Sequence, residues 1–241
     1  MLISGVAGDE KIFQIVTLPF FVRNFDELRL LIDIAHPYFD KSAQKWGQKI
    51  LYIAPWPGAG LWTKKKATTL QDFKGLKTRT YDKNGALVME AVGATPFALP
   101  FSEVYTSLQT GLIDSVMTST PTAVDGKFWE VLKYFEPLNI TIATDMVTVN
   151  LKAFQKLPKA QQDILVKIGK EMEAAMWANV KTWDKEQEAI SNKNGIETVK
   201  PSDKVIGELE KITENIRAEW LKTAPADGKK IYNEFMKKVK R

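Results

Sequence analysis

Three runs in the middle of the chain decide its fold: DFKGLKTRTY at 72–81, VGATPFALPFSEVYTSLQTGLIDS at 92–115 and GKFWEVLKYF at 126–135. Within them, short apolar runs typical of strands alternate with amphipathic stretches typical of helices. Gly93 and Gly111 stand where helices would end, which suits the left-handed residue of a helix C-terminus. Such an alternation is typical of an α/β fold. The predicted strands are Leu76–Tyr81, Thr95–Leu99 and Ile113–Thr118, and the predicted helices are Asn84–Val92 and Glu103–Thr110, the second with Ser102 as its N-cap.

The alternation continues on both sides of these runs. Upstream, the apolar spacing of Phe25–Phe39 predicts a helix, and Lys49–Ala54 predicts a strand. Pro55–Gly60 (PWPGAG) is predicted as a loop, because two prolines and two glycines interrupt any regular pattern there. Downstream, Val124–Tyr134 predicts a helix and Met146–Asn150 a strand.

A long helix is predicted after Pro158, a residue that suits the first turn of a helix. Apolar residues recur at helical spacing until Asn194–Gly195. At 1.5 Å per residue, about 30 residues would make a helix roughly 45 Å long, enough to bridge two lobes. Beyond it, Ile196–Val199 predicts a short strand, and Asp203–Trp220 and Lys229–Val239 predict two helices.

The composition is that of an ordinary globular protein, with 44% hydrophobic and 26% charged residues in 241. This length suits one large domain or two lobes. The absence of cysteine excludes disulfides, thiolate zinc sites, iron–sulfur clusters and cysteine nucleophiles. One histidine leaves little material for a histidine metal site or a catalytic triad.

The net charge of +5 lies at the C-terminal end, where Gly228–Arg241 holds six basic residues and one acidic residue. A nucleic-acid-binding protein would carry a basic stripe across its fold, so we expect no nucleic-acid partner. The apolar stretch Ile12–Val22 is too short to span a membrane. It also lacks the basic n-region of a signal peptide, so we expect a chain that stays in the cytoplasm or has lost its leader.

No constellation for catalysis is found in the sequence. Gly58-Ala59-Gly60 lacks the third glycine of the dinucleotide-binding fingerprint. His36 precedes Pro37 and is predicted to lie at a helix end, as a surface or capping imidazole. Adjacent acid pairs such as Asp26 and Glu27 point to different faces and are interpreted as solvated or capping groups.

The three runs resemble the substrate-binding proteins of TRAP transporters, the DctP-type family of tripartite ATP-independent periplasmic systems. The most specific motifs are GLKTR at 75–79 and PFSEVYTSLQTGLID at 100–114. Leu18-Pro19-Phe20 resembles the LPF element of the family, and Met146–Asn150 followed by Leu157-Pro158 resembles the stretch before its long helix. The resemblance covers nearly the whole chain. It implies a two-lobed, periplasmic-binding-protein-like α/β fold with a long helix that bridges the lobes.

The resemblance also implies a ligand site. It places the conserved arginine of the family at Arg79, whose planar guanidinium can grip a carboxylate through two parallel hydrogen bonds. Phe101, just before a predicted helix, corresponds to an aromatic residue that borders the ligand pocket. Thr118 and Ser119 stand where relatives have a polar ligand contact, often asparagine. One branch of the family holds its ligand through a cation with an acidic residue and a tryptophan at this place, and neither is present here, so we expect no metal and no cofactor.

The sequence departs from sugar-acid-binding relatives in the segment PWPGAGLW at 55–62. Those relatives carry a second basic residue there, near the place of Gly60. Trp56, Trp62 and Tyr81 stand nearby instead, either as packing residues or as pocket residues. The second interpretation predicts a more apolar pocket, suited to an aromatic or branched monocarboxylate.

The implied lobes are discontinuous in sequence. Lobe one would comprise 1–56 and 143–182, and lobe two 57–142 and 183–241, with hinges near Trp56, Ala143 and Thr182. Family members open with a secretory signal and a strand–helix–strand–helix stretch before the LPF element. We therefore expect the leader and the N-terminal part of lobe one to be missing, through a truncated gene, a misplaced start or a trimmed sequence.

The function that the resemblance implies is that of an extracytoplasmic solute-binding protein. It would capture an organic acid in the inter-lobe cleft, in the periplasm, and deliver it to TRAP membrane permease subunits. We expect a monomer that is not an enzyme. Two alternatives remain: an α/β enzyme acting on a carboxylic acid, which a turnover assay would detect, and an orphan sensor protein that binds a ligand without a permease.

Overall fold

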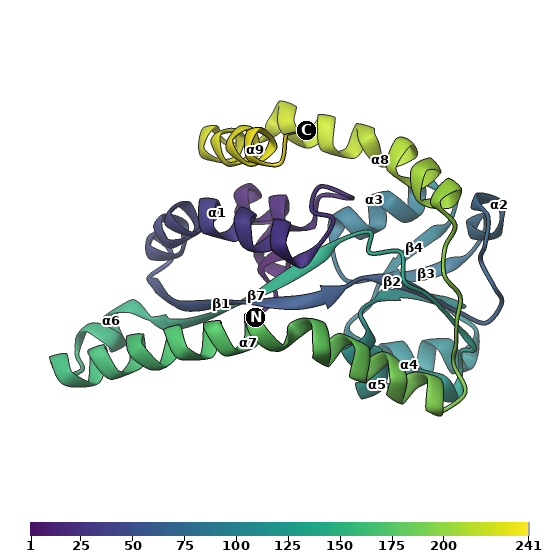
Figure 1. The fold of residues 1–241 in the computed structure, drawn as a ribbon, viewed down its shortest axis with the longest axis horizontal. Helices are drawn as coiled ribbons and strands as arrows, with labels where there is room; N and C mark the ends of the chain where they lie inside the picture. Colours follow the sequence, from purple (N-terminus) through teal and green to yellow (C-terminus); the bar gives the residue numbers. More distant parts are fainter. Residues whose placement is uncertain (241) are drawn as a thin grey trace.

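The motif-bearing middle of the chain folds around a six-stranded sheet, in a computed structural model that describes residues 1–240 (Figure 1). The strand order is β4-β3-β5-β2-β6-β8, with β3 parallel to β4 and β5, and β2 antiparallel to β5 and β6. The bounds are β2 (Gly60–Thr63), β3 (Lys77–Thr80), β4 (Thr95–Ala98), β5 (Ser115–Thr118), β6 (Tyr134–Glu136) and β8 (Glu197–Thr198). A mixed sheet with helices packed on it confirms the predicted α/β class.

A second sheet pairs β1 (Gln48–Gly58) with β7 (Ile142–Asn150) in antiparallel fashion. The predicted loop at Pro55–Gly60 is therefore wrong, because β1 runs through both prolines to Gly58. Among residues 1–240, β1 has no sheet neighbour other than β7. Proline has no backbone N–H to donate. An edge strand tolerates proline because one of its sides forms no hydrogen bonds with another strand.

Helices cover both sheets. The two glycines predicted to end helices, Gly93 and Gly111, adopt φ values of +80° and +77°. The α-helices are α1 (Phe25–Lys45), α2 (Leu70–Phe73), α3 (Lys83–Ala91), α4 (Phe101–Thr110), α5 (Thr120–Asp125), α6 (Leu151–Gln155), α7 (Lys159–Lys193), α8 (Asp203–Thr223) and α9 (Ala226–Lys238). Short 3-10 helices occupy η1 (Ile3–Val6), η2 (Lys11–Thr17) and η3 (Phe128–Glu130).

The helix predicted over Val124–Tyr134 does not form as one element. The α-helix α5 ends at Asp125, η3 follows, and Tyr134 already begins strand β6. Lys127 adopts a left-handed conformation with φ of +48°, which is incompatible with the interior of a right-handed α-helix. Long-range pairing of β6 with β2 overrides the local helical pattern.

His36 does not lie at a helix end. Helix α1 continues through Pro37 to Lys45, so the histidine is in its interior. Its Nδ1 lies 3.4 Å from Oδ2 of Asp40, one turn further along a partly exposed face. His36 therefore behaves as a surface residue of a helix.

Each sheet has its own hydrophobic core. The β1–β7 sheet packs with η2 and α1 around Phe13 and Phe39. The six-stranded sheet has one cluster that contains Phe73, next to α3 and α8, and another that contains Trp62 and Phe128, next to α4. Separately packed cores are the physical basis of a two-lobed molecule.

Helix α7 confirms the predicted long helix. Its 35 residues span about 52 Å, and it runs along the whole lower side of the molecule in Figure 1. Gly169 lies so close to β1 that a Cβ would stand 2.8 Å from the carbonyl oxygen of Leu51. Near its other end, Asp184 accepts a hydrogen bond of 2.6 Å from Oγ1 of Thr120 at the start of α5. The helix thus contacts both lobes.

Helix α8 joins the two cores as well. Val205 and Leu209 belong to the core next to α3, whereas Trp220 belongs to the core of the β1–β7 sheet. The segment Leu18–Asn24 is divided in the same way. Phe20, at φ of +51°, packs into the first of these cores, and its neighbour Phe21 packs into the second.

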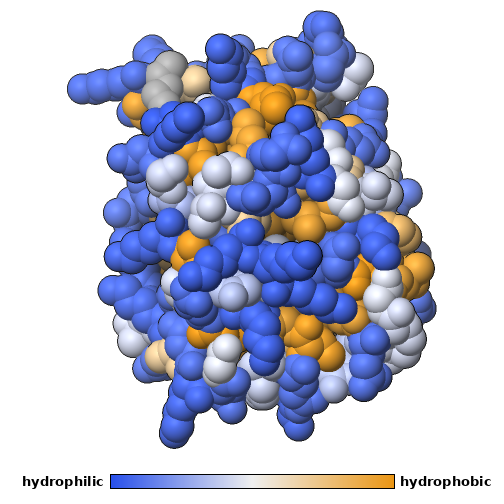
Figure 2. All heavy atoms as spheres, turned by 90° about the vertical axis from the view of Figure 1, so that its right-hand side faces the viewer, coloured by the Kyte–Doolittle hydropathy of each residue, from blue (hydrophilic) through white to orange (hydrophobic). Residues whose placement is uncertain are grey.

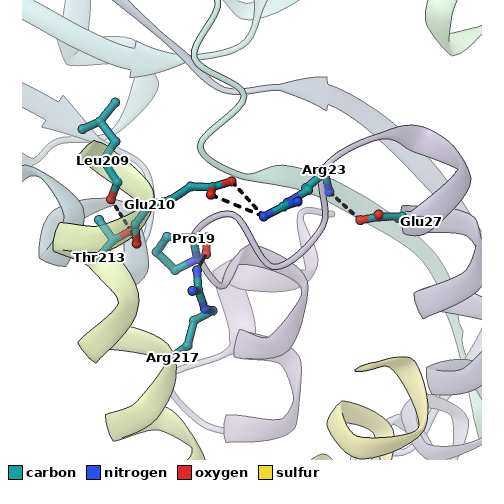
Figure 3. Close-up of polar contacts among 7 residues, drawn as sticks. All are labelled: Pro19, Arg23, Glu27, Leu209, Glu210, Thr213 and Arg217. Carbon is teal, nitrogen blue, oxygen red and sulfur yellow. Dashed lines mark hydrogen bonds and ion pairs between the residues drawn. The ribbon is translucent and has the colours of Figure 1, made fainter. Parts of the chain in front are cut away.

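Two arginine contacts fasten that segment to α8 (Figure 3). Nη1 of Arg217 donates a hydrogen bond of 2.7 Å to the carbonyl oxygen of Pro19, and Nη2 of Arg23 lies 3.2 Å from Oε1 of Glu210. The Arg23 pair is exposed and contributes little to stability. The Arg217 bond is partly buried and restrains the segment that enters both cores.

The lobe limits derived from the sequence, 1–56 with 143–182 and 57–142 with 183–241, stay a prediction. We propose one change to them. Ile231 and Phe235 of α9 pack in the same cluster as Phe39 of α1, so α9 would be counted with lobe one.

The side of the molecule near α2 carries a mixed surface. Figure 2 shows mostly hydrophilic side chains there, with separate hydrophobic patches between them. Among the helices of residues 1–240, none combines the length and the apolar character that a membrane crossing requires.

Candidate functional site

A cavity of about 290 Å³ opens between the β1–β7 sheet and the six-stranded sheet. All six residues that the sequence singled out, Trp56, Arg79, Tyr81, Phe101, Thr118 and Ser119, line it. Their role as ligand contacts stays a prediction. The remaining lining residues are Leu2, Pro57, Ala59, Thr122, Asp125, Ala143 and Asp145.

Arg79 is the one basic residue among those that line the cavity. It sits on β3, between Phe97 of β4 and Val116 of β5, and only 7% of the residue is exposed. Its Nε donates a hydrogen bond of 3.1 Å to the carbonyl oxygen of Leu99, which fixes the plane of the guanidinium. Among residues 1–240, neither an acidic side chain nor a hydrogen-bond acceptor partners its two terminal nitrogens.

The environment of Arg79 penalises its charge. Burial lowers the pKa of Arg79 below its ordinary value, while Tyr81 and Asp82 act in the opposite direction. Because no carboxylate of residues 1–240 lies within ion-pair distance of the guanidinium, its burial is costly, and an anion that fills the cavity would offset part of that cost. The arrangement is therefore suited to binding a carboxylate.

Trp56 is held by two contacts. Its Nε1 donates a 2.8 Å hydrogen bond to Oγ of Ser119, which lies 3.0 Å from Oγ1 of Thr122. Its ring meets the ring of Trp183 on α7 edge to face, with centroids 5.2 Å apart. Because Trp56 comes from β1 and Ser119 follows β5, this bond ties the two walls of the cavity together.

Tyr81 and Thr118 are also fixed. The hydroxyl of Tyr81 lies 2.7 Å from Oγ1 of Thr141, and burial raises the pKa of Tyr81, so the phenol stays neutral. Thr118 is 3% exposed, and its carbonyl oxygen accepts a hydrogen bond of 3.1 Å from Nε1 of Trp62. Trp62 itself is fully buried and stacks on Phe135, so it packs the core and does not line the cavity.

Phe101 projects into the cavity with 44% of its surface exposed. Helix α4 begins at Phe101, with Pro100 as its N-cap, so Ser102 is not the cap that the sequence predicted. Pro100 ends the preceding extended segment and sets the start of the helix two residues earlier. The exposed ring is free to pack against a ligand.

The structure leaves no room at Gly60 for the second basic side chain that the sequence lacks there. A Cβ at this position would clash with the carbonyl oxygen of Glu136 and with the ring of Phe135. The close approach of β2 and β6 thus requires glycine. Gly58-Ala59-Gly60 is a tight strand connection in this structure.

Two acidic side chains, Asp125 and Asp145, line the same cavity and were missed from the sequence. Asp145 lies on β7, opposite Ala54 of β1, and 25% of its side chain is exposed. Burial raises the pKa of the Asp145 carboxyl, and the Met1 ammonium, 3.8 Å away, acts against that rise. The two-residue period of a strand that starts at Ile142 would have placed Ala143 and Asp145 on one face.

In the part of the chain that the structure describes, no three histidine, cysteine, aspartate or glutamate side chains come close enough to hold a metal ion. The expectation that the protein uses no metal, because neither an acidic residue nor a tryptophan stands at Thr118 or Ser119, stays a prediction.

Comparison with protein families gives one match over nearly the whole chain. The family described as bacterial extracellular solute-binding protein, family 7 (DctP), matches residues 3–223. The sialic acid-binding periplasmic protein SiaP of Vibrio cholerae is 30% identical over 191 residues, which cover 78% of this chain. That alignment spans 60% of the length of the Vibrio protein.

Solved structures of similar proteins share the architecture. The extracytoplasmic solute receptor DctP7 of Bordetella pertussis, described as binding pyroglutamic acid, matches with a TM-score of 0.93 and 28% identity. DctP6 of the same organism, also described as binding pyroglutamic acid, matches with a TM-score of 0.93 and 29% identity. Each alignment covers 98% of this chain, and 78% and 79% of the two receptors.

Proposed function

This chain belongs to family 7 of the bacterial extracellular solute-binding proteins, the DctP family, and from that premise we propose that it captures a small organic acid in the cavity around Arg79. The ligand would be held by one carboxylate. The protein would act in the periplasm, as a monomer, and deliver the acid to the membrane subunits of a TRAP transporter.

The observation that carries this proposal is that the two terminal nitrogens of the Arg79 guanidinium have no hydrogen-bond or ion-pair partner among residues 1–240. Arg79 is 7% exposed, lines the cavity, and forms no ion pair among residues 1–240. A carboxylate would accept two parallel hydrogen bonds from such a fork. Because Leu99 already orients Nε, little side-chain entropy would be lost on binding.

The size and the walls of the cavity favour a small monocarboxylate. A volume of about 290 Å³ lies at the lower end of the range for ligand pockets. Trp56 and Phe101 offer two aromatic surfaces, and Arg79 is the one basic side chain among the lining residues. A compact acid with an apolar or cyclic body fits these walls better than a large polyhydroxylated sugar acid.

A role without catalysis agrees with the residues around the cavity. No histidine, cysteine or lysine lies among the residues that line it. The relatives named above are described as a binding protein and receptors. We therefore propose a receptor rather than an enzyme.

A screen of organic acids tests the proposal. Thermal-shift and native mass spectrometry measurements on the chain should find a small monocarboxylate that binds one to one. Turnover of the bound acid, or failure of every carboxylate to bind while neutral ligands do, would remove the proposed function.

A further inference from the structure

Strand β1 has a long side that pairs with no other strand. Among residues 1–240, β1 pairs with β7 alone, so the opposite side of its eleven residues, here called the outer edge, faces no strand. The edge strands of the six-stranded sheet are shorter, with four residues in β4 and two in β8. An unpaired edge presents backbone N–H and C=O groups that a strand of another chain can join.

The pairing with β7 shows which residues of β1 point to the outer edge. Ile53 lies opposite Met146, whose N–H and carbonyl oxygen both bond to Met1, on the side of β7 away from β1, each at 2.8 Å. Opposite residues of an antiparallel pair alternately bond each other and point away from each other. Ile53 therefore points to the outer edge, and so does Pro55 two residues later.

Two side chains of α7, which runs along β1 in Figure 1, occupy the backbone groups of Ile53. Oε2 of Glu173 accepts a hydrogen bond of 3.2 Å from the Ile53 N–H. Nε1 of Trp177 donates a hydrogen bond of 3.1 Å to the Ile53 carbonyl oxygen. Glu173 and Trp177 are four residues apart and so share one face of the helix. Together they supply the acceptor and the donor that a neighbouring strand would supply.

Arg29 of α1 holds both of these side chains. Its Nη1 lies 3.0 Å from Oε1 of Glu173, whose side chain is 19% exposed. Its guanidinium carbon lies 5.1 Å from the centre of the Trp177 ring, a cation–π contact. Because Arg29 contacts both residues, it restrains them where they meet Ile53. We call Arg29, Glu173 and Trp177 the edge clamp.

The positions on either side of Ile53 are closed in other ways. Pro55 points to the outer edge but has no N–H to donate, and Pro57 lacks one as well. In the other direction, the pairing register shifts at Leu51, and its carbonyl oxygen lies against Gly169 of α7. Prolines and irregular register both interrupt the regular row of groups that a second strand would need.

We infer that the edge clamp blocks strand addition at the outer edge of β1, and that the partner it excludes is β1 of a second copy of this chain. Two copies related by a two-fold axis would present the same edge to each other, and each would supply what the other lacks. Ile53 offers both an N–H and a carbonyl oxygen there, and the clamp occupies both. The inference gives a physical reason for the monomer proposed above and does not depend on the ligand.

The test removes the two hydrogen bonds while keeping the bulk of the side chains. Trp177→Phe keeps an aromatic ring beside Arg29 but loses the N–H donor, and Glu173→Leu loses the acceptor. Size-exclusion chromatography with light scattering should find the double variant of the full chain associating at a concentration at least about tenfold lower than the parent, because its backbone groups at Ile53 are free to pair with a second copy.

Two further variants separate strand addition from a general loss of stability. Glu173→Gln keeps a carbonyl oxygen that can accept the Ile53 hydrogen bond, and it should associate no more than the parent. Arg217→Ala is the matched control, because it removes a hydrogen bond from a side chain to a carbonyl oxygen away from the outer edge. It should also associate no more than the parent.

Hydrogen exchange of the Ile53 amide shows where association occurs. In dilute solution the amide of the parent should be protected, and that of the double variant should exchange at least about tenfold faster. In the associated double variant the protection should return, because a strand of the second copy then accepts the hydrogen bond.

Several results would overturn the inference: association of the double variant at the same concentration as the parent, equal association of Arg217→Ala, or an associated state in which the Ile53 amide still exchanges fast. If the double variant does not fold, the exchange measurement is made on Glu173→Leu and Trp177→Phe separately. Unchanged protection of Ile53 in both would then overturn it.

Discussion

Truncation of Arg79 is the perturbation with the largest expected effect on binding. Loss of one partner of a buried, hydrogen-bonded charge pair costs about 2–5 kcal/mol. At about 1.4 kcal/mol for each factor of ten, Arg79→Ala should weaken carboxylate binding by about 30-fold to several thousandfold. Arg79→Lys keeps the charge but loses the planar fork and the Nε bond to Leu99, so it should recover only part of the affinity.

The effect on folding should be small by comparison. Arg79→Ala removes a desolvated cation that forms no ion pair among residues 1–240. This gain opposes the loss of the Leu99 hydrogen bond, about 1 kcal/mol, and of the attraction to Asp82. Urea unfolding without ligand should therefore stay within about 1 kcal/mol of the parent.

The assay is calorimetric titration with an acid that the parent binds, together with circular dichroism. Arg23→Ala is the matched control, because it removes an arginine from an exposed pair outside the cavity. If Arg79→Ala binds within about threefold of the parent, a difference of only ~0.6 kcal/mol, the guanidinium does not anchor the ligand and the reasoning fails.

Three further predictions follow from other parts of the structure. Burial raises the pKa of Glu136 from 4.5 to about 7, so between these pH values the folded state holds a proton that the unfolded state lacks. The free energy of unfolding should therefore fall by about 3 kcal/mol as pH rises across that window. Urea titrations at several pH values should show this fall, and Glu136→Gln should flatten the profile. Arg217→Ala should lower the free energy of unfolding by about 1.5 kcal/mol through loss of the Pro19 bond, whereas exposed Lys222→Ala should leave it unchanged. Saturating ligand should reduce the radius of gyration in X-ray scattering as the lobes close, and an unchanged radius would refute closure.

Local sequence signals predicted most of the helices. Pro158 and the apolar period after it predicted α7, which begins at Lys159. Gly93 and Gly111 predicted two helix ends, because glycine adopts positive φ without steric cost. Signals of this kind act within a few residues and need no partner from elsewhere in the chain.

Strands were harder to predict where long-range pairing decides them. Pro55–Gly58 has the composition of a loop, yet it extends β1 because β7 supplies a partner across an edge. Tyr134 has the spacing of a helix, yet it joins β6 because β2 lies beside it. In both segments the hydrogen bonds to a distant strand outweigh the local preference.

The motifs by themselves determined the α/β class, the long helix and the family, and with the family six cavity residues, including Arg79. Only the tertiary structure showed that the terminal nitrogens of Arg79 have no partner among residues 1–240, and that Asp145 of the other sheet lines the same cavity. The two residues are far apart in sequence and lie on strands that never pair with each other. Their convergence depends on how α7 and α8 hold two separate cores together, and such packing leaves no periodic signal in the sequence.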